Sequence, residues 1–496
     1  MRRVPPPPID RPAVGTAEAG SWRVAVALVL AASLAACGAL PSAPDVAAEL
    51  PAQWREGATT TVSISPAWVA AFGSVELGRL VELAEADNLD IAAAAARIVQ
   101  AEATLAGAAA DLGPTVSGSA DSSRRLTPGT ASRSSPPFHG TVSNSFGLSA
   151  DVSWRLDLNG RLRALADAQR ATLEASRFDR EAVRLSTVTT LVDAYLSLAA
   201  AEDQLRIARE NAEIAERTLG VIRRRLEVGT ATALDLAQQE SVVATQRAAI
   251  PDLEITRRRQ KIAIAVLTGR APEALTVTGT GLGRLKLPKV SAGLPSRLLV
   301  RRPDIAEAEA RLSAQAANVE AARAAFLPDV SLTGSGGLSS AFLKNLLRPE
   351  ALLASISGSV TETIFDGGAK QADLDTARAR HAELAASYRK TVHSALADVE
   401  NALVEIEQTR RHEVLQTAVV TAARKAQRLT EERLAEGTIA VTTVLDAERT
   451  LFQAEQTLVG VRLSRFQAVV SLAAALGGGW ERGTEAPAPP LPKADP

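Results

Sequence analysis

The chain has 496 residues, with 55 basic and 56 acidic side chains, one cysteine and only 3% aromatic residues. Because no basic surplus is available to neutralise phosphates, this charge balance excludes nucleic acid as the main partner. A single cysteine excludes a disulfide framework and a cysteine-based zinc site. The apolar content of 46% predicts a folded chain, and the low share of aromatic residues favours closely packed helices.

The N-terminal region has the pattern of an export signal. Val24 to Leu34 form an apolar run that follows Arg23, and the run is too short for a membrane helix but typical of a signal-peptide core. Leu34-Ala35-Ala36-Cys37 comes next and resembles a bacterial lipobox, a motif that is cut before its cysteine, whose sulfur then carries lipid. We therefore predict a signal peptide over residues 1–36 and a lipid-anchored segment over 37–74, attached through Cys37.

The chain is internally duplicated. Residues 225–230 (RLEVGT) recur as 433–438 (RLAEGT) at an offset of 208, and earlier blocks recur at an offset of 214. Several aligned blocks in one order indicate two copies of one structural unit. We place the first repeat at 75–290 and the second at 291–479, and we predict that the Pro/Ala-rich tail over 480–496 is disordered.

Each repeat has the pattern of a helix, a β-hairpin and two further helices. The first repeat predicts a helix over about 75–112, a hairpin over about 114–160, and helices over about 161–226 and 230–268. The second predicts the corresponding elements over about 303–325, 328–367, 369–434 and 440–476. Apolar residues recur every three or four positions from Leu198 to Leu226, which is typical of a coiled-coil seam. Pro251 is expected to kink or break its helix.

The strand pattern is typical of a membrane strand. From Phe146 to Asn159 apolar residues, including Trp154, alternate with polar ones, including Asp157, over more residues than a usual soluble strand has. We expect Phe146, Trp154, Asp157 and Phe365 in the strands of a membrane β-barrel. Four strands cannot close a barrel, so the pattern predicts an oligomer, either two copies with eight strands or, if the purpose is a conduit, three with twelve.

Enzyme chemistry has no support in the sequence. The four histidines, His139, His381, His393 and His412, lack the spacing of a zinc site. Neither a phosphate-binding glycine loop nor a nucleophile elbow occurs. We predict a protein without catalytic residues, cofactor or metal.

The motifs resemble those of the outer membrane factors, the TolC-like channel proteins, and among them the NodT-type efflux lipoproteins. The resemblance covers about Ala52 to Gly479. It rests on the lipobox, the duplication and five segments: residues 299–312, 324–328, 154–161, 364–368 and 437–449.

This resemblance implies a mainly α-helical homotrimer with a shared 12-stranded outer membrane barrel and a 12-helix periplasmic barrel. It implies a lipid-anchored exit duct that passes small toxic compounds or drugs from a periplasmic adaptor and an inner-membrane pump, commonly proton-driven, to the exterior. Two alternatives remain: a duct for type I protein secretion, and a lipid-anchored coiled-coil scaffold without a pore.

The resemblance also places a gate at the helix turns. Gly229-Thr230 and Gly437-Thr438 occupy the tips of the two turns, and the family's gate acids map to Thr443 and Asp446, with Asp235 in the first turn. Only Asp446 keeps a carboxylate at the second turn, and three copies would favour cations. Leu434 and Ile439 occupy positions where other members carry polar partners, so we expect different contacts to close this tip.

Overall fold

The computed structural model describes residues 51, 53–55, 68–127, 141–288 and 292–483. All of them belong to one compact unit, Val46–Pro496. The signal peptide, Cys37, His139, most of the first hairpin loop and residues 484–496 lie outside the described residues.

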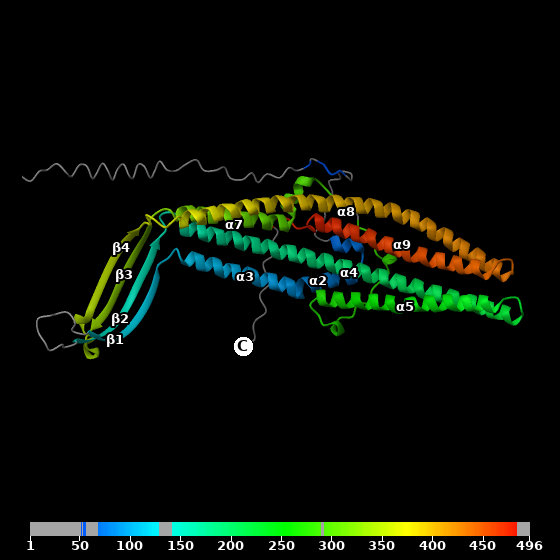
Figure 1. Ribbon diagram of the computed structural model, residues 1–496, viewed down its shortest axis with the longest axis horizontal. Coiled ribbons are helices and arrows are strands. Elements are labelled where there is room, and N and C mark those ends of the chain that lie inside the picture. Colours follow the sequence, from blue (N-terminus) through cyan, green and yellow to red (C-terminus); the bar gives the residue numbers. More distant parts are fainter. Residues whose placement is uncertain (1–50, 52, 56–67, 128–140, 289–291, 484–496) are drawn as a thin grey trace, which may run out of the picture. The chain divides into compact units, whose positions relative to one another are not determined.

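The described fold is mainly helical and duplicated (Figure 1). The first repeat contains helices α2 (Val75–Asp87) and α3 (Leu89–Ala110), strands β1 (Thr115–Thr127) and β2 (Thr141–Leu156), and helices α4 (Arg161–Glu227) and α5 (Ala233–Leu267). The second contains α7 (Pro303–Ala324) after the short α6 (Leu298–Arg301), then β3 (Asp329–Ser340), β4 (Leu352–Thr361), α8 (Ala369–Ala435) and α9 (Val441–Ala475). Both long helices have 67 residues and both returning helices 35.

The long helices pack in hairpins that meet along α4. Helix α4 contacts α3, α5, α7 and α9, and α8 contacts α7 and α9. The predicted seam is buried from Leu198 to Ile222, with alanine at Ala201, Ala208, Ala212 and Ala215. Small side chains at these positions let the helix axes approach closely, which explains how a chain so poor in aromatics forms a dense core.

The helix predicted over 75–112 is two helices, and that prediction is wrong. Asn88 has extended backbone geometry, and its side-chain oxygen accepts from the amides of Asp90 and Ile91 at 2.9 and 3.1 Å. Its amide nitrogen donates to the carbonyl of Leu267 at 2.8 Å. Asparagine is a strong N-cap, so this residue ends α2, begins α3 and ties both to the end of α5.

Pro251 does not break α5, which is continuous from Ala233 to Leu267. A proline inside a helix leaves the carbonyl four residues earlier without its amide partner. Here both Pro251 and Arg247 are exposed, so water can take the place of the missing donor.

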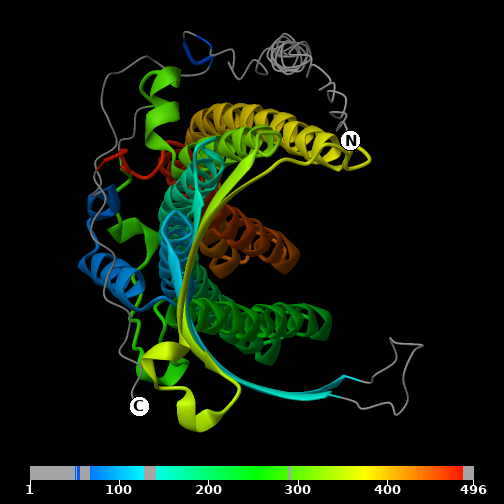
Figure 2. The same ribbon diagram turned by 90° about the vertical axis from the view of Figure 1, so that its left-hand side faces the viewer.

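The four strands form one antiparallel sheet in the order β1-β2-β3-β4 (Figure 1), and the sheet is curved (Figure 2). The register places Val152 opposite Val116 and Gly334, and Leu148 opposite Ala120 and Leu338, so the apolar residues of neighbouring strands share one face. All but one of the exposed large apolar side chains of the strands, the exception being Leu353, lie on one face: Val116, Leu126, Val142, Leu148, Val152, Trp154, Leu332, Leu352, Ile356 and Val360. Serine and threonine dominate the other face.

Two of the four residues expected in strands lie outside them. β2 ends at Leu156, and the Asp157 carboxylate accepts from the amides of Leu162 and Arg163 at 2.9 and 3.0 Å, which stabilises the start of α4. Phe365 follows the end of β4 at Thr361 and is exposed. Phe146 and Trp154 lie in β2.

Helix α9 is long and apolar enough by composition to span a membrane, yet 56% of its most apolar window is buried against other parts of the fold. It contributes Phe466, Val470 and Ala473 to the main core cluster. Its apolar side therefore serves the core of the helical part.

Candidate functional site

The two helix turns are near copies of one another. Gly229 and Gly437 both adopt a backbone φ of 75°, a value that residues other than glycine rarely adopt. The amides of Thr230 and Thr438 donate to the carbonyls of Arg225 and Arg433 at 2.7 and 3.0 Å, and both threonine hydroxyls donate to the same carbonyls at 3.1 Å. This is a Schellman turn reinforced by a threonine, and it appears at the same place in both repeats.

The turns differ at the start of the following helix. Thr232 and Asp235 form a capping box at the start of α5: the Asp235 amide donates to the Thr232 hydroxyl at 3.2 Å, and the Thr232 amide donates to the Asp235 carboxylate at 2.8 Å. Hydrogen bonds from the Thr232 side chain and backbone lower the pKa of Asp235. The equivalent residues of the second turn are Ala440 and Thr443, and α9 has no side-chain cap.

The second turn is joined to the first by an arginine and an apolar cluster. Arg225 of α4 donates from Nη1 to the carbonyl of Leu434 in α8 at 2.7 Å. Leu434, Val441 and Val444 are buried with Ile222, and Ile439 packs against them. Leu434 and Ile439, where other members carry polar partners, both lie in this apolar cluster.

Asp446 lies on the exposed side of α9 beside a basic residue. Arg449 donates to its carboxylate at 2.6 Å, and both side chains are 68% exposed. Thr443 is exposed one turn earlier on the same helix. The carboxylate expected at the gate is therefore present, but a cation three residues later offsets part of its charge.

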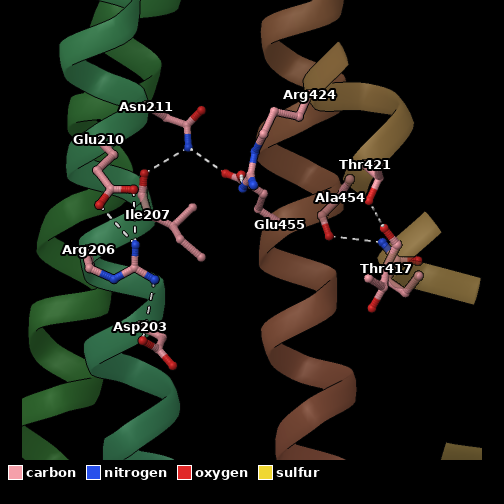
Figure 3. A network of polar contacts seen from close by, with 11 residues as sticks. Asp203, Arg206, Ile207, Glu210, Asn211, Thr417, Thr421, Arg424, Ala454 and Glu455 are labelled. Carbon is pink, nitrogen blue, oxygen red and sulfur yellow. Dashed lines mark hydrogen bonds and ion pairs between the residues drawn. The ribbon is translucent and has the colours of Figure 1, made fainter. Parts of the chain in front are cut away.

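Sequence reasoning missed the polar residues that join the helices near the turns. In Figure 3, Asn211 of α4 and Arg424 of α8 converge on the Glu455 carboxylate of α9, at 3.2 and 2.5 Å. The repeat offset of 208 is the signal that could have found them: it pairs Arg424 with Glu216 and Glu455 with Arg247, and those two residues also form an ion pair, at 2.7 Å.

The polar face of the sheet carries pairs of hydroxyl groups. Ser119 and Ser149 lie 2.8 Å apart, and 2.7 Å separates the oxygens of Ser331 and Ser359, of Thr333 and Ser357, and of Ser335 and Ser355. Cross-strand hydroxyl pairs stabilise a sheet. They also give this face a hydrophilic surface of small side chains.

Among the described residues, no cluster of three or more His, Cys, Asp or Glu side chains could hold a metal ion. The site features of this part of the chain are therefore the two turns, the polar contacts between the helices and the two contrasting faces of the sheet. A sheet with one exposed apolar face, attached to long helical hairpins, defines a class of membrane protein that spans the bilayer with strands.

Comparison with known proteins identifies the family within that class. The family model for outer membrane efflux proteins matches residues 80–270 and 294–478. The pyoverdine export outer membrane protein OpmQ of Pseudomonas putida is 37% identical over 461 residues, 92% of this chain and 97% of its own. The toluene efflux pump outer membrane protein TtgC of P. putida is 31% identical, over 91% of this chain and 94% of its own.

A solved structure agrees with the sequence comparisons. The open state of the Neisseria gonorrhoeae MtrE outer membrane channel superimposes with a TM-score of 0.78 at 29% identity, over 91% of this chain and 100% of that chain. The chain belongs to the outer membrane efflux protein family, which confirms the family predicted from its motifs. It is an outer membrane component of an efflux system, with a mainly helical fold that carries a four-stranded sheet.

Proposed function

We propose that three copies of the chain form a continuous duct across the outer membrane and into the periplasm. The observation that carries this proposal is the sheet: its apolar face is exposed, and in the described fold β1 and β4 each pair on one side only. In lipid, each backbone group left unpaired at those edges costs several kcal/mol. Pairing β4 of one copy with β1 of the next removes that cost.

Three copies suit the purpose better than two. Twelve strands enclose a lumen, whereas side chains nearly fill a barrel of eight. The face that would line the lumen carries Ser119, Ser149, Thr333 and Ser357, whose small hydroxyl side chains leave room for passage.

The same proposal assigns the helical part to the periplasm. Its turns would meet a periplasmic adaptor that links the duct to an inner-membrane pump, driven by protons, and the duct itself would conduct passively and catalyse no reaction. We propose small toxic compounds or drugs as cargo, since the relatives are named for exporting pyoverdine and toluene. A duct for secreted proteins is the alternative cargo class. The other alternative, a scaffold without a pore, does not explain why one face of the sheet is apolar and exposed.

The proposed anchor is Cys37, which lies outside the described residues. Cys37→Ser should abolish incorporation of labelled palmitate while the helical part still folds. Palmitate uptake by this variant would contradict the lipobox interpretation.

Native mass of the detergent-extracted protein, followed by conductance in a planar bilayer, tests the duct. We expect a trimer and discrete conductance steps once the tip is opened. A monomer that never conducts would support the scaffold instead.

A further inference from the structure

The two helical hairpins carry ion pairs at equivalent places. In the first hairpin, α4 pairs with α5 through Arg223–Glu240 at 3.0 Å and through Glu216–Arg247 at 2.7 Å, all four side chains being at least 42% exposed. In the second hairpin the equivalent of Glu216–Arg247 is Arg424–Glu455, an ion pair with its polarity reversed. The contact between helices is therefore retained at this position although both residues have changed.

The other position has lost its positive partner. The equivalents of Arg223 and Glu240 are Glu431 in α8 and Glu448 in α9, so two acids take the place of an ion pair. Glu448 is also buried, at 4% exposed. Its Oε1 accepts from the Thr218 hydroxyl of α4 at 2.7 Å, and its Oε2 is buried without a hydrogen-bond partner in the described part of the chain.

The neighbouring groups leave this charge largely uncompensated. From α4, Arg217 attracts both acids, but it is exposed and forms no ion pair with either in the described structure. From α5, the Gln239 amide nitrogen donates to the Ala215 carbonyl at 2.8 Å, and its Oε1 is buried without a hydrogen-bond partner among the described residues. From α8, Gln427 hydrogen-bonds Glu431. Burial raises the pKa of both acids, and the charge of Glu431 raises that of Glu448 further.

The position of the pair couples it to the tip. Glu448 lies two helical turns after the start of α9 at Val441, and its contact with Thr218 crosses from α9 to α4. The first turns of α9 have no side-chain cap, and they contact α4 through the apolar cluster around Val444 and through Glu448. A buried charge without a partner destabilises such a contact, whereas the protonated acid does not.

We propose that Glu431 of α8 and Glu448 of α9 form a proton-binding pair, that protonated Glu448 holds α9 against α4, and that loss of the proton loosens the periplasmic tip. The proposal rests on the duct function proposed above. A carboxyl group that prefers its proton in the packed state stabilises that state at low pH and loses this contribution as the pH rises. The tip therefore opens more readily as the pH rises above the ordinary range of glutamate, and closes on acidification.

Three variants test the pair. Glu448→Gln mimics the protonated acid, Glu431→Arg rebuilds the ion pair of the first hairpin, and Glu240→Gln removes the equivalent carboxylate as a matched control. The full-length protein is inserted in planar bilayers, and the open fraction is measured between about pH 4.5 and pH 8.

For the wild-type protein and Glu240→Gln, we expect the ratio of open to closed channels to rise with pH, by up to about tenfold per pH unit where one proton is fully linked to opening. Glu448→Gln and Glu431→Arg should lose this dependence and stay closed. A pH dependence retained in both variants would overturn the proposal, and so would its loss in Glu240→Gln.

Amide hydrogen exchange gives a readout that does not require conduction. Exchange in the first turns of α9 should slow on acidification, beyond the intrinsic effect of pH, in the wild type and not in Glu448→Gln. Absence of conductance in every variant would count against the duct, but the exchange measurement would still test the pair. Equal exchange in the wild type and Glu448→Gln would overturn the proton-binding pair alone.

Discussion

Asp193 in α4 is a half-buried acid with one buried carboxylate oxygen. Its Oδ1 has no hydrogen-bond partner among the described residues, and burial raises its pKa to about 6. Since the folded-state pKa is above the ordinary value, the acid lowers stability progressively as the pH rises through about 6. The equivalent residue of the second repeat is already an amide, Asn401.

Asp193→Asn should therefore stabilise the protein at pH 8 and change little at pH 4. After a discount for partial solvent screening, we expect a gain on the order of 1 kcal/mol, seen as a higher thermal midpoint in detergent. Asn401→Asp, at the equivalent but exposed position of α8, is the control and should leave the midpoint at pH 8 nearly unchanged. An equal effect of Asp193→Asn at both pH values would show that ionisation is not the cause.

The pair Asp446–Arg449 sets the charge at the exposed side of α9. Removing the cation with Arg449→Ala leaves the carboxylate uncompensated, so cation preference of the open pore should rise. Asp446→Asn should lower it. Reversal potentials in a salt gradient measure both, and Arg433→Ala, in the last turn of α8, serves as a control for loss of a nearby charge. If neither Asp446 nor Arg449 changes the reversal potential, the pair lies away from the constriction.

At the scale of elements, the two turns differ in capping, so the first turn of α9 is less stable than the first turn of α5. Ala440→Thr with Thr443→Asp transplants the capping box of Thr232 and Asp235 into the second turn. A capping residue contributes about 1 kcal/mol, which corresponds to roughly fivefold slower hydrogen exchange of the Leu445 and Asp446 amides. Thr232→Ala should accelerate exchange at the start of α5 by a similar factor. Unchanged exchange in both variants would mean that the turns are held by tertiary packing alone.

Much of the element order could be predicted from the sequence because it depends on local patterns. Duplicated turns, an apolar seam and alternating strands each leave a periodic signal. The failures occur where one side chain decides a boundary. Asn88 divides a helix by capping α3, and Asp157 ends the alternation because it accepts from the first amides of α4, although both residues continue the pattern of their neighbours.

The polar contacts between helices could not be predicted because they depend on residues far apart in the chain. Arg225 reaches a carbonyl 209 residues away, and Thr218 reaches Glu448 across 230 residues. The repeat offset aligned these positions, but only the packing of α4 on α9 shows that Glu448 is buried while Glu240 is exposed.

At the scale of the whole molecule, the sheet edges determine assembly. In the order β1-β2-β3-β4, the outer strands run antiparallel to each other, so β4 of one copy can pair with β1 of the next in the same sense as every pair inside the sheet. A shift of one residue in the pairing of β4 with β1 moves every side chain of one strand to the other face. The polar faces of neighbouring copies are therefore continuous only in every second possible register. Ser119 in β1 and Ser355, Ser357 and Ser359 in β4 lie on the polar face.

Paired cysteines should therefore cross-link neighbouring copies and count them. We expect Ser119→Cys combined with one of Ser355→Cys, Ser357→Cys or Ser359→Cys to give a ladder that ends at three chains on a denaturing gel after oxidation in membranes. Each single variant controls for cross-links through Cys37, and Val116→Cys with Ser357→Cys, which places the thiols on opposite faces, should not link. A ladder that ends at two would mean an eight-stranded barrel and would remove the room for a duct, because side chains nearly fill a barrel of that size.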